Sequence, residues 1–348
     1  MAKVIVGMSG GVDSSVAAIL LKEQGYEVIG ITFIFTEDFD ATDAINVCKK
    51  LNIEHHIIDY KDIFKEKIIN KFIDDYKSGI TPNPCVLCNK EVKLNFLYQN
   101  MLLYNCDYIA TGHYAKIIDG RLYKSVDKNK DQTYFLAQLN NEQLNKLLLP
   151  LEGIDKDKVR EIARKYGLGV ANKKDSTDVC FINSNFREFI SSKVKSNKGD
   201  VINISSNKVI GQHNGLANYT IGQRKGLNIG GNKSRIYVVG KNPHDNILYV
   251  ANSDDNNYLI STSCIITNVN LINKENIKTA TAKFRYRQDE NPVEIEYLSN
   301  NDLLIKYKDG VKSVTPGQTC VLYKDDECLG SGIIKEVQKN NEKLWYLL

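Results

Sequence analysis

The chain has 348 residues, of which 42% are hydrophobic and 25% are charged, a balance typical of globular proteins. No window approaches the roughly 18 uninterrupted apolar residues of a membrane helix, so the composition excludes a helical membrane protein and predicts a soluble one. The formal net charge is +4, and eight cysteines are too few for a disulfide scaffold. The N-terminal apolar run is too short for a signal peptide, so we expect a cytoplasmic protein whose cysteines remain thiols.

The first half of the chain alternates β-type runs with segments of helical periodicity. A length above 300 residues predicts more than one domain. We expect strands at 3–8, 27–35, 56–59 and 107–111, and helices at 13–24, 42–51, 63–76, 141–148 and 155–166. Strands that alternate with helices predict a parallel sheet covered on both faces, and hence an α/β domain.

The second half has a different texture, in which Gly, Asn and Ser separate short β-type runs. These runs lie at 237–239, 246–251, 264–272, 279–286, 293–297, 303–307, 319–323 and 332–337. Many short strands predict a small mixed module followed by an antiparallel β-barrel. We therefore expect an α/β domain at 1–197, a central module at 198–262 and a C-terminal β-barrel at 263–348.

A basic segment extends from Lys193 to Lys241. It holds nine basic residues against one acidic residue, Asp200, which gives a local net charge of +8. Such an excess is the electrostatic pattern of a surface that binds a polyanion, although a solvated basic face would have the same composition.

A glycine-rich loop, SGGVDSS at Ser9 to Ser15, joins the first expected strand to the first helix. Its glycines let the backbone N–H groups point at an anion, its hydroxyls add donors, and the helix N-terminus adds a positive end. The loop lacks the Gly-Lys-Ser/Thr ending of a Walker A motif. It resembles the SGGxDS loop of the N-type ATP pyrophosphatases, which adenylate a carbonyl oxygen. That resemblance implies that Asp13 assists magnesium and pyrophosphate placement.

Two cysteine-bearing segments follow, TPNPCVLCNK at 81–90 and KDSTDVCF at 174–181. The chain also contains TGHY at 111–114, KDQ at 130–132, YTIGQRKG at 219–226, RYRQ at 285–288 and PGQ at 316–318. In this order, the motifs resemble the bacterial tRNA-specific 2-thiouridylase family, also written MnmA or TrmU, from residue 4 to about residue 334. The resemblance implies a PP-loop domain of the adenine nucleotide alpha hydrolase type at the N-terminus.

The resemblance also implies substrates, partners and site residues. It implies ATP, magnesium, a persulfide sulfur donor protein, and the wobble uridine 34 of glutamate, glutamine and lysine tRNAs. It assigns ATP binding to Gly7, Met8, Ser9, Gly10, Gly11, Val12, Asp13, Ser14, Phe33 and Gly112. It assigns target-base contact to Asn83, Pro84 and Cys85, and tRNA contact to His113, Lys130, Asp131, Gln132, Arg285, Tyr286 and Gln318.

Two further basic clusters are candidate RNA contacts on chemical grounds. Arg224 and Lys225 lie between glycines, so the backbone there can approach a phosphate that they neutralise. Arg285 and Arg287 alternate on an expected strand, which would place both on one face; a solvated face is the alternative reading.

The expected chemistry needs sulfur. The uridine 2-oxygen is a poor leaving group, and adenylation converts it into a phosphate ester that departs as AMP. A thiolate or persulfide is the natural attacking group at neutral pH. In the family scheme, Cys180 receives the persulfide sulfur. Cys88 then attacks to release hydrogen sulfide, or forms a disulfide with Cys180 as the product leaves.

Two positions depart from the family pattern. Cys85 stands where aspartate is frequent and creates a Cys-x-x-Cys pair with Cys88, and Asp178 stands where glycine is common. Three thiolates, at Cys85, Cys88 and Cys180, could instead hold a possible [4Fe-4S] cluster whose open iron binds sulfide. A zinc site with His113 as fourth ligand and a neutral substitution at Cys85 are the other readings.

Two other functions remain open on the sequence. An ATP pyrophosphatase that amidates or ligates a small metabolite would need neither the basic segment nor the paired cysteines. A catalytically inactive tRNA-binding protein would have lost the loop or a cysteine, whereas all are present. The remaining cysteines are expected to fill cores or strands: Cys48, Cys106, Cys264, Cys320 and Cys328.

Overall fold

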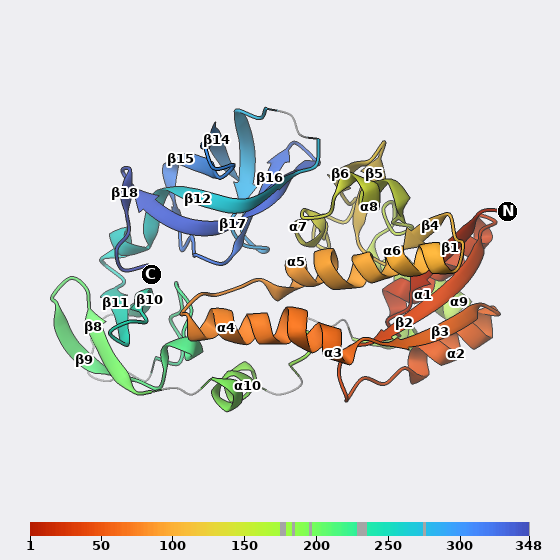
Figure 1. Ribbon diagram of the computed structural model, residues 1–348, viewed down its shortest axis with the longest axis horizontal. Helices are drawn as coiled ribbons and strands as arrows, with labels where there is room; N and C mark the ends of the chain where they lie inside the picture. Colours follow the sequence, from red (N-terminus) through yellow and green to blue (C-terminus); the bar gives the residue numbers. More distant parts are fainter. Residues whose placement is uncertain (175–178, 183–184, 195–196, 228–234, 274–275, 348) are drawn as a thin grey trace.

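The protein has three parts, as Figure 1 shows. The computed structural model describes residues 1–174, 179–182, 185–194, 197–227, 235–273 and 276–347. An α/β part carries the N-terminus, a small β-module lies at the opposite end, and a β-barrel lies beside both. No described helix combines the length and the apolar character needed to cross a membrane.

The α/β part is built on a five-stranded parallel sheet in the order β3-β2-β1-β4-β7. Its strands are β1 Lys3–Gly7, β2 Glu27–Ile34, β3 Glu54–Asp59, β4 Tyr108–Ala110 and β7 Leu147–Leu148. Because successive strand residues point to opposite faces, Val4 and Val6 pack on one layer of helices and Ile5 on the other. The predicted parallel sheet with two covered faces is therefore confirmed.

The first layer contains α1 Val12–Glu23, α2 Thr42–Leu51 and α9 Lys156–Lys165. The second contains α3 Lys61–Phe64, the π-helical turn Lys65–Asn70, α4 Lys71–Lys77 and α6 Leu94–Leu103. The helix expected at 141–148 is shorter, because α8 Asn141–Lys146 ends where Leu147 and Leu148 pair with β4 as an edge strand.

A long helical segment at 84–103 escaped the sequence-based prediction. It comprises α5 Pro84–Cys88, a π-helical turn at Asn89–Lys93 and α6. Asn83 precedes it in an extended conformation and Pro84 occupies the first helical position, where its missing N–H costs nothing. Buried residues on several sides hide the amphipathic rhythm, so the periodicity gave no clear signal. In Figure 1 this segment runs alongside α3 and α4.

The central module is a four-stranded sheet in the order β10-β11-β8-β9, with one parallel pair, β11 and β8. Its strands are β8 Gly199–Asn203, β9 Lys208–His213, β10 Ile236–Asn242 and β11 Ile247–Asn252. Helix α10 Phe186–Lys193 precedes it, and short 3-10 turns lie at Gly169–Asn172, Leu216–Asn218 and Asn256–Leu259. The mixed module predicted from the sequence is present.

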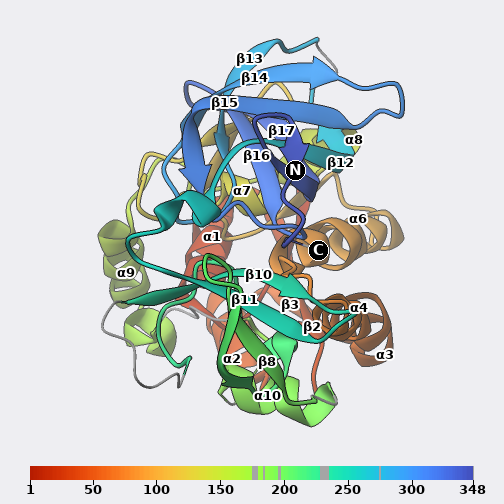
Figure 2. The same cartoon turned by 90° about the vertical axis from the view of Figure 1, so that its left-hand side faces the viewer.

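The C-terminal part is a closed antiparallel barrel, because β12 pairs with both β15 and β17. Its six strands are β12 Ile260–Leu271, β13 Thr279–Lys283, β14 Asn291–Tyr297, β15 Leu303–Lys312, β16 Thr319–Lys324 and β17 Glu327–Lys339, with β18 Glu342–Lys343 added at β17. Figure 2 shows the barrel above the central module. The barrel predicted from the sequence is confirmed.

Two features of the barrel differ from the sequence-based expectation. The hairpin of β5 Ala115–Ile118 and β6 Arg121–Lys124, with α7 Thr133–Leu136 nearby, comes from the α/β half of the chain but pairs with β17. The strand expected at 279–286 ends at Lys283, because the chain then turns and Gln288 N donates to Arg285 O. Arg285 and Arg287 therefore do not alternate on a strand, and Arg285 is half-buried while Arg287 is exposed.

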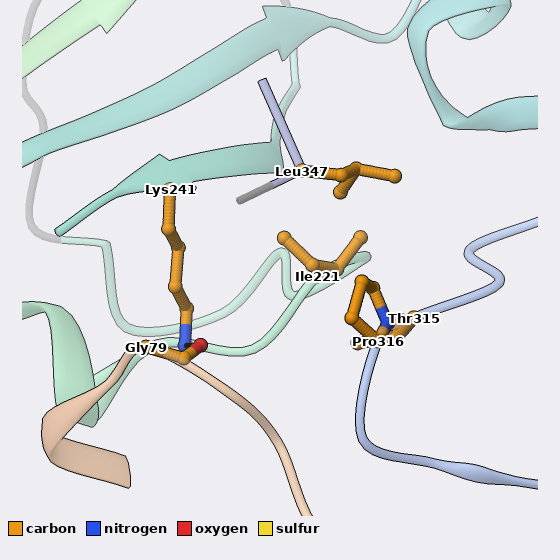
Figure 3. A pocket seen from close by; sticks show the side chains of 6 residues that line it. All are labelled: Gly79, Ile221, Lys241, Thr315, Pro316 and Leu347. Carbon is orange, nitrogen blue, oxygen red and sulfur yellow. Dashed lines mark hydrogen bonds between the residues drawn. The ribbon is translucent and has the colours of Figure 1, made fainter. Parts of the chain in front are cut away.

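The three parts meet around Lys241 of β10 (Figure 3). Its side chain is only 2% exposed, and its ammonium donates to the Gly79 carbonyl, just beyond α4, over 3.1 Å. A cavity of about 10 Å³ beside it has room for no more than one water, and is lined by Gly79, Ile221, Lys241, Thr315, Pro316 and Leu347. Lys241 belongs to the basic segment by sequence, but its burial removes it from any surface that could bind a polyanion.

Candidate active site

The SGGVDSS loop connects β1 to α1 as predicted and is held by its own hydroxyls. Gly10 has φ of +72°, which an L side chain rarely adopts. The hydroxyls of Ser9 and Ser14 are 3.1 Å apart, and Ser15 Oγ donates to the Gly11 carbonyl over 2.8 Å. The loop is thus fixed around the N-terminus of α1, an arrangement suited to an anion.

Gly112, which follows β4, lies directly against this loop. A Cβ at Gly112 would come within 2.6 Å of the carbonyl carbon of Asp13 and 2.7 Å of Ser14 N, so only glycine fits. Gly112 and the SGGVDSS loop, both predicted to bind ATP, therefore lie together.

Phe33, also predicted to bind ATP, lies near the end of β2. It is buried among aromatic rings, with its centroid 5.3 Å from that of Tyr60.

Asp13 is engaged by two side chains that the sequence-based analysis missed. Lys156 Nζ lies 2.7 and 2.8 Å from its two carboxylate oxygens, and the Tyr114 hydroxyl donates to Oδ1 over 2.7 Å. A second lysine, Lys173, donates to the Gly10 carbonyl over 3.3 Å and pairs with Asp43 at 2.6 Å. Each lysine reaches the loop from a part of the chain more than 140 residues away, so no local sequence motif connects it with the loop.

The three candidate sulfur residues gather beside the helical segment at 84–103. Cys85 is half-buried, Cys88 is 4% exposed and Cys180 is exposed, and all are free thiols. The charge states of Cys85 and Cys180 each influence the pKa of Cys88, so segments far apart in sequence come together. Burial raises the pKa of the Cys88 thiol to about 12, which the positive charge of Lys93 opposes.

Cys180 owes its position to its neighbour in the sequence. Phe181 is buried, and its ring packs against those of Phe64 and Phe72, with centroids 5.8 and 5.3 Å away. Beside this buried ring, the Cys180 thiol lies exposed at the surface. Asp178, the second departure from the family pattern, lies outside the described residues.

Lys93 reaches the thiols because the helix widens after Cys88. In an α-helix, five residues turn the side chain by about 140°, which would carry Lys93 away from Cys88. The π-helical turn at Asn89–Lys93 closes its hydrogen bonds five residues apart, and the Lys93 backbone N–H donates to the Cys88 sulfur. Burial lowers the pKa of Lys93, but the thiols of Cys88, Cys180 and Cys85 together raise it above its ordinary value.

His113 directly follows Gly112 and is hydrogen-bonded within its own segment. Its Nδ1 is 2.8 Å from Thr111 Oγ1. Burial, with a smaller contribution from the charge of Lys93, lowers the pKa of His113 to about 3, so its imidazole is neutral at pH 7. His113 thus directly follows the glycine that packs on the SGGVDSS loop, and it lies close enough to Lys93 for the charge of that lysine to act on it.

The segment predicted to contact the target base is held by the barrel. Gln318 Nε2 donates to the carbonyls of Thr81 and Pro82 over 2.7 and 3.3 Å. The Asn83 side chain hydrogen-bonds to the hydroxyl of Tyr134, which also donates to Thr319 O over 2.8 Å. Gln318, predicted as a tRNA contact, thus touches the backbone just before Asn83.

Most of the other residues predicted to contact tRNA form hydrogen bonds to other residues of the protein. Asp131 is buried, and its Oδ2 accepts from Thr133 over 2.7 Å. Gln132 Oε1 accepts from Tyr114 N over 2.9 Å, and the Tyr286 hydroxyl donates to Asp131 O over 3.1 Å.

The basic candidates fall into two groups. Arg285 donates to Ile221 O over 2.9 Å and to Thr315 Oγ1 over 2.7 Å, and Lys130 is half-buried. Arg224 and Lys225 are exposed and open to a phosphate. The tRNA-binding roles of all these residues remain predictions.

The alternative metal sites find no matching geometry in the described part of the chain. No group of three or more His, Cys, Asp or Glu side chains there is arranged to hold a metal ion. Cys85, Cys88 and Cys180, with or without His113, do not form a ligand set in this conformation. We therefore derive no step through an iron–sulfur cluster or zinc.

Comparisons with known proteins cover nearly the whole chain. Family models described as tRNA methyl transferase HUP domain, tRNA methyl transferase PRC-barrel domain and Aminomethyltransferase beta-barrel domain match residues 2–184, 187–252 and 261–334. The tRNA-specific 2-thiouridylase MnmA of Mycoplasmopsis synoviae (strain 53) is 44% identical, and that of Bacillus licheniformis is 45% identical. Each alignment covers 99% of this chain and 98% of the relative.

A solved 4-thiouridine synthetase–RNA complex with bound ATP is 16% identical, with a TM-score of 0.35 over 56% of this chain and 50% of that chain. The full-length identity to the two MnmA proteins confirms the resemblance drawn from the ordered motifs. With 44–45% identity to these relatives over 99% of its length, the chain belongs to the family of tRNA-specific 2-thiouridylases, MnmA.

Proposed function

We propose that this chain adenylates O2 of wobble uridine 34 with ATP and replaces that oxygen with sulfur from a persulfide on Cys180. Its membership of the MnmA family makes it a tRNA-uridine 2-sulfurtransferase. The observation that carries the mechanism is a sequence of neighbours: Gly112 packs on the SGGVDSS loop, His113 follows it, and the charge of Lys93 acts on both His113 and Cys88. An adenylated base and a reactive sulfur can meet only in such a site.

The loop and the first turn of α1 receive the phosphates of ATP, aided by the backbone near Phe33 and Gly112. The Asp13 carboxylate fits magnesium, a hard cation that prefers oxygen ligands and would neutralise charge on the pyrophosphate. The Tyr114 hydroxyl donates to this carboxylate over 2.7 Å and helps to fix its orientation. Both ATP and tRNA are cytoplasmic substrates, which is consistent with a cytoplasmic enzyme.

Sulfur transfer then follows in balanced steps. Uridine O2 attacks the α-phosphorus, the uracil N3 proton is released, and pyrophosphate leaves. The terminal sulfur of the Cys180 persulfide attacks C2, and AMP leaves with the former O2. Cys88 attacks the Cys180 sulfur, which forms a disulfide and frees 2-thiouridine. External thiols must reduce this disulfide before another turnover.

Cys88 suits the last of these steps. Its buried thiol, with a pKa raised to about 12, stays protonated in the resting site and does not compete for the activated base. Lys93 lies in position to stabilise the thiolate when the site fills. Cys180, which is exposed, can accept sulfur from a persulfide donor protein.

The tRNA would lie across the α/β part, the central module and the barrel. Arg224 and Lys225 are exposed cations for its backbone, and Asn83 to Cys85 would contact the flipped uridine. The family resemblance supports glutamate, glutamine and lysine tRNAs as substrates.

The test is to incubate the protein with ATP, magnesium, a persulfide donor and tRNA, and to look for 2-thiouridine by mass spectrometry of nucleosides. Cys88→Ser and Cys180→Ser should each abolish the product, whereas Cys106→Ser, outside the site, should not. A wild-type protein that forms no 2-thiouridine would refute the proposal. Thiolation that survives the loss of Cys88 would refute the disulfide step.

The iron–sulfur alternative has its own readout. Protein purified without oxygen should lack the broad absorption of a cluster near 400 nm and should still thiolate tRNA. A coloured protein that loses activity with its iron would instead establish the cluster mechanism.

A further inference from the structure

Lys156 occupies an unusual place for a lysine. It is the first residue of α9, its side chain is 11% exposed, and it pairs with Asp13, which lies 143 residues earlier. A cation at a helix N-terminus opposes the helix dipole, which favours acids there. The neighbouring Asp155 and Asp157 follow that preference. The stability of α9 therefore does not explain Lys156.

The pairing with Asp13 places the ammonium at the SGGVDSS loop. Lys156 Nζ lies within 2.8 Å of both carboxylate oxygens, and Asp13 itself is in the first turn of α1. The loop lacks the lysine that a Walker A motif contributes from its own sequence. Helix α9 packs against α1 and supplies a lysine to the same anion site from outside the motif.

We propose that Lys156 is a catalytic residue that moves its ammonium from Asp13 to the β- and γ-phosphates of ATP and stabilises the departing pyrophosphate. This inference rests on the adenylation proposed above. In the free enzyme, Lys156 neutralises Asp13. Asp13 would hold a magnesium ion that arrives with ATP, and the lysine, a compact cation with three donors, would then be free to turn to the phosphates.

The bond changes of this step place charge where Lys156 can reach it. A lone pair of uridine O2 forms the new bond to the α-phosphorus. The electron pair of the broken bond passes to the pyrophosphate oxygen. Negative charge therefore grows on the pyrophosphate as it leaves, and a positioned cation stabilises that transition state more than the ground state.

A purely structural role is the competing explanation, in which Lys156 only neutralises Asp13 and keeps the loop in shape. The two roles differ in which nucleotide they affect. A phosphate-binding lysine matters for ATP and pyrophosphate but not for AMP, which lacks the β- and γ-phosphates. A structural lysine would affect ATP and AMP alike.

The experiment compares Lys156→Met with Lys158→Met, a control on the same helix whose lysine is exposed and pairs with Glu161. We expect Lys156→Met to slow tRNA-dependent pyrophosphate release about 100-fold and to weaken ATP binding about 10-fold, while AMP binding stays within about twofold. Lys156→Arg should recover part of the rate. Lys158→Met should match the wild type. Equal weakening of ATP and AMP, or an unchanged rate, would overturn the proposal.

Two further comparisons keep the result interpretable. If Lys156→Met folds poorly because the Asp13 carboxylate is left without its cation, the double variant Asp13→Asn with Lys156→Met removes the unbalanced charge. ATP binding should then remain weaker than in Asp13→Asn alone, and equal binding would reject the inference. A wild type that releases no pyrophosphate with tRNA refutes adenylation itself, whereas a normal wild type and a normal Lys156→Met refute only the role of Lys156.

Discussion

At the scale of single residues, the site depends on close approaches that leave no spare room. Gly112 is in contact with the backbone of Asp13 and Ser14, so there is no room for a side chain at this position. Lys93 depends on a single π-helical turn to reach Cys88. Each is a local feature with a consequence for the reaction.

Gly112→Ala should disable the nucleotide site. Its Cβ would meet backbone atoms at 2.6 to 2.7 Å, so the loop must shift. We expect ATP affinity to fall more than about 10-fold and stability to fall by about 1–3 kcal/mol. Gly153→Ala is the matched control, because a Cβ there meets nothing within 4 Å. Unchanged ATP binding in Gly112→Ala, measured by calorimetry, would contradict the close packing described here.

Lys93→Met should make Cys88 less reactive. Lys93 opposes the rise in the Cys88 pKa, so its loss should raise that pKa further and leave less thiolate at any given pH. The measurement is the rate of Cys88 alkylation by iodoacetamide from pH 7 to 10, followed by peptide mass spectrometry. The curve should move to higher pH. Lys90→Met, on the same π-helical turn, should have the same pH dependence of alkylation as the wild type. If Lys93→Met also matches the wild type, Lys93 has no electrostatic effect on Cys88.

At the scale of elements, α5 is positioned by the barrel rather than by its own sequence. Helix α4 ends at Lys77, and the chain from Gly79 to Asn83 is gripped by side chains from both other parts before α5 begins. Gly317, with φ of +88°, packs so closely on Ile80 that a Cβ there would be 2.1 Å from its side chain. The loop that carries Gln318 therefore acts as the support for the target-base segment.

Gln318→Leu should weaken this support. The variant keeps the side-chain size but leaves the carbonyls of Thr81 and Pro82 without their donor, which should cost about 1–3 kcal/mol. We expect an earlier urea transition and faster proteolysis near residue 80. Gln99→Leu, exposed on α6, is the control. A variant with normal stability and only weaker tRNA binding would show that Gln318 acts on the RNA alone.

At the scale of the whole molecule, the three parts are joined by buried polar contacts around one small cavity. Among the described residues, no carboxylate pairs with the Lys241 ammonium, which donates a hydrogen bond to Gly79 O. Burial lowers the pKa of Lys241 to about 7. The region around Lys241 where the three parts meet, which we call the joint, thus contains a lysine that is about half-protonated near pH 7.

The stability of the joint should depend on pH through this lysine. Between pH 7 and 10.5, the unfolded chain holds a proton on Lys241 that the folded chain lacks. The contribution of Lys241 to the free energy of unfolding is therefore greatest above pH 10.5. It decreases as the pH falls from 10.5 to 7, and it is constant below pH 7.

Lys241→Met should remove this dependence and raise the melting temperature near pH 7.5. The readout is the difference in melting temperature between variant and wild type, which should shrink as pH rises from 7.5 to 9.5. Lys208→Met, exposed on β9, should show no such trend. A difference that stays constant with pH would refute the buried-lysine account.

By itself, the sequence determined most strands and helices of the α/β part and most strands of the barrel, together with the anion loop and the two cysteine segments. These features depend on hydrophobic periodicity, on glycines and on residue types within short stretches of chain, so neighbouring residues are enough to predict them. It also determined the family, since the motifs stand in a fixed order. It missed the helical segment at 84–103, where apolar residues on several sides hide the helical rhythm.

Only the tertiary structure decided which residues meet. It brought Lys156 to Asp13, Lys93 to the thiols and Gln318 to the segment before Asn83. It also buried Lys241 and joined the hairpin of β5 and β6 to the barrel. The physical reason is that each contact depends on how separate elements pack, and a buried lysine and a solvated one have the same sequence signature until that packing is known.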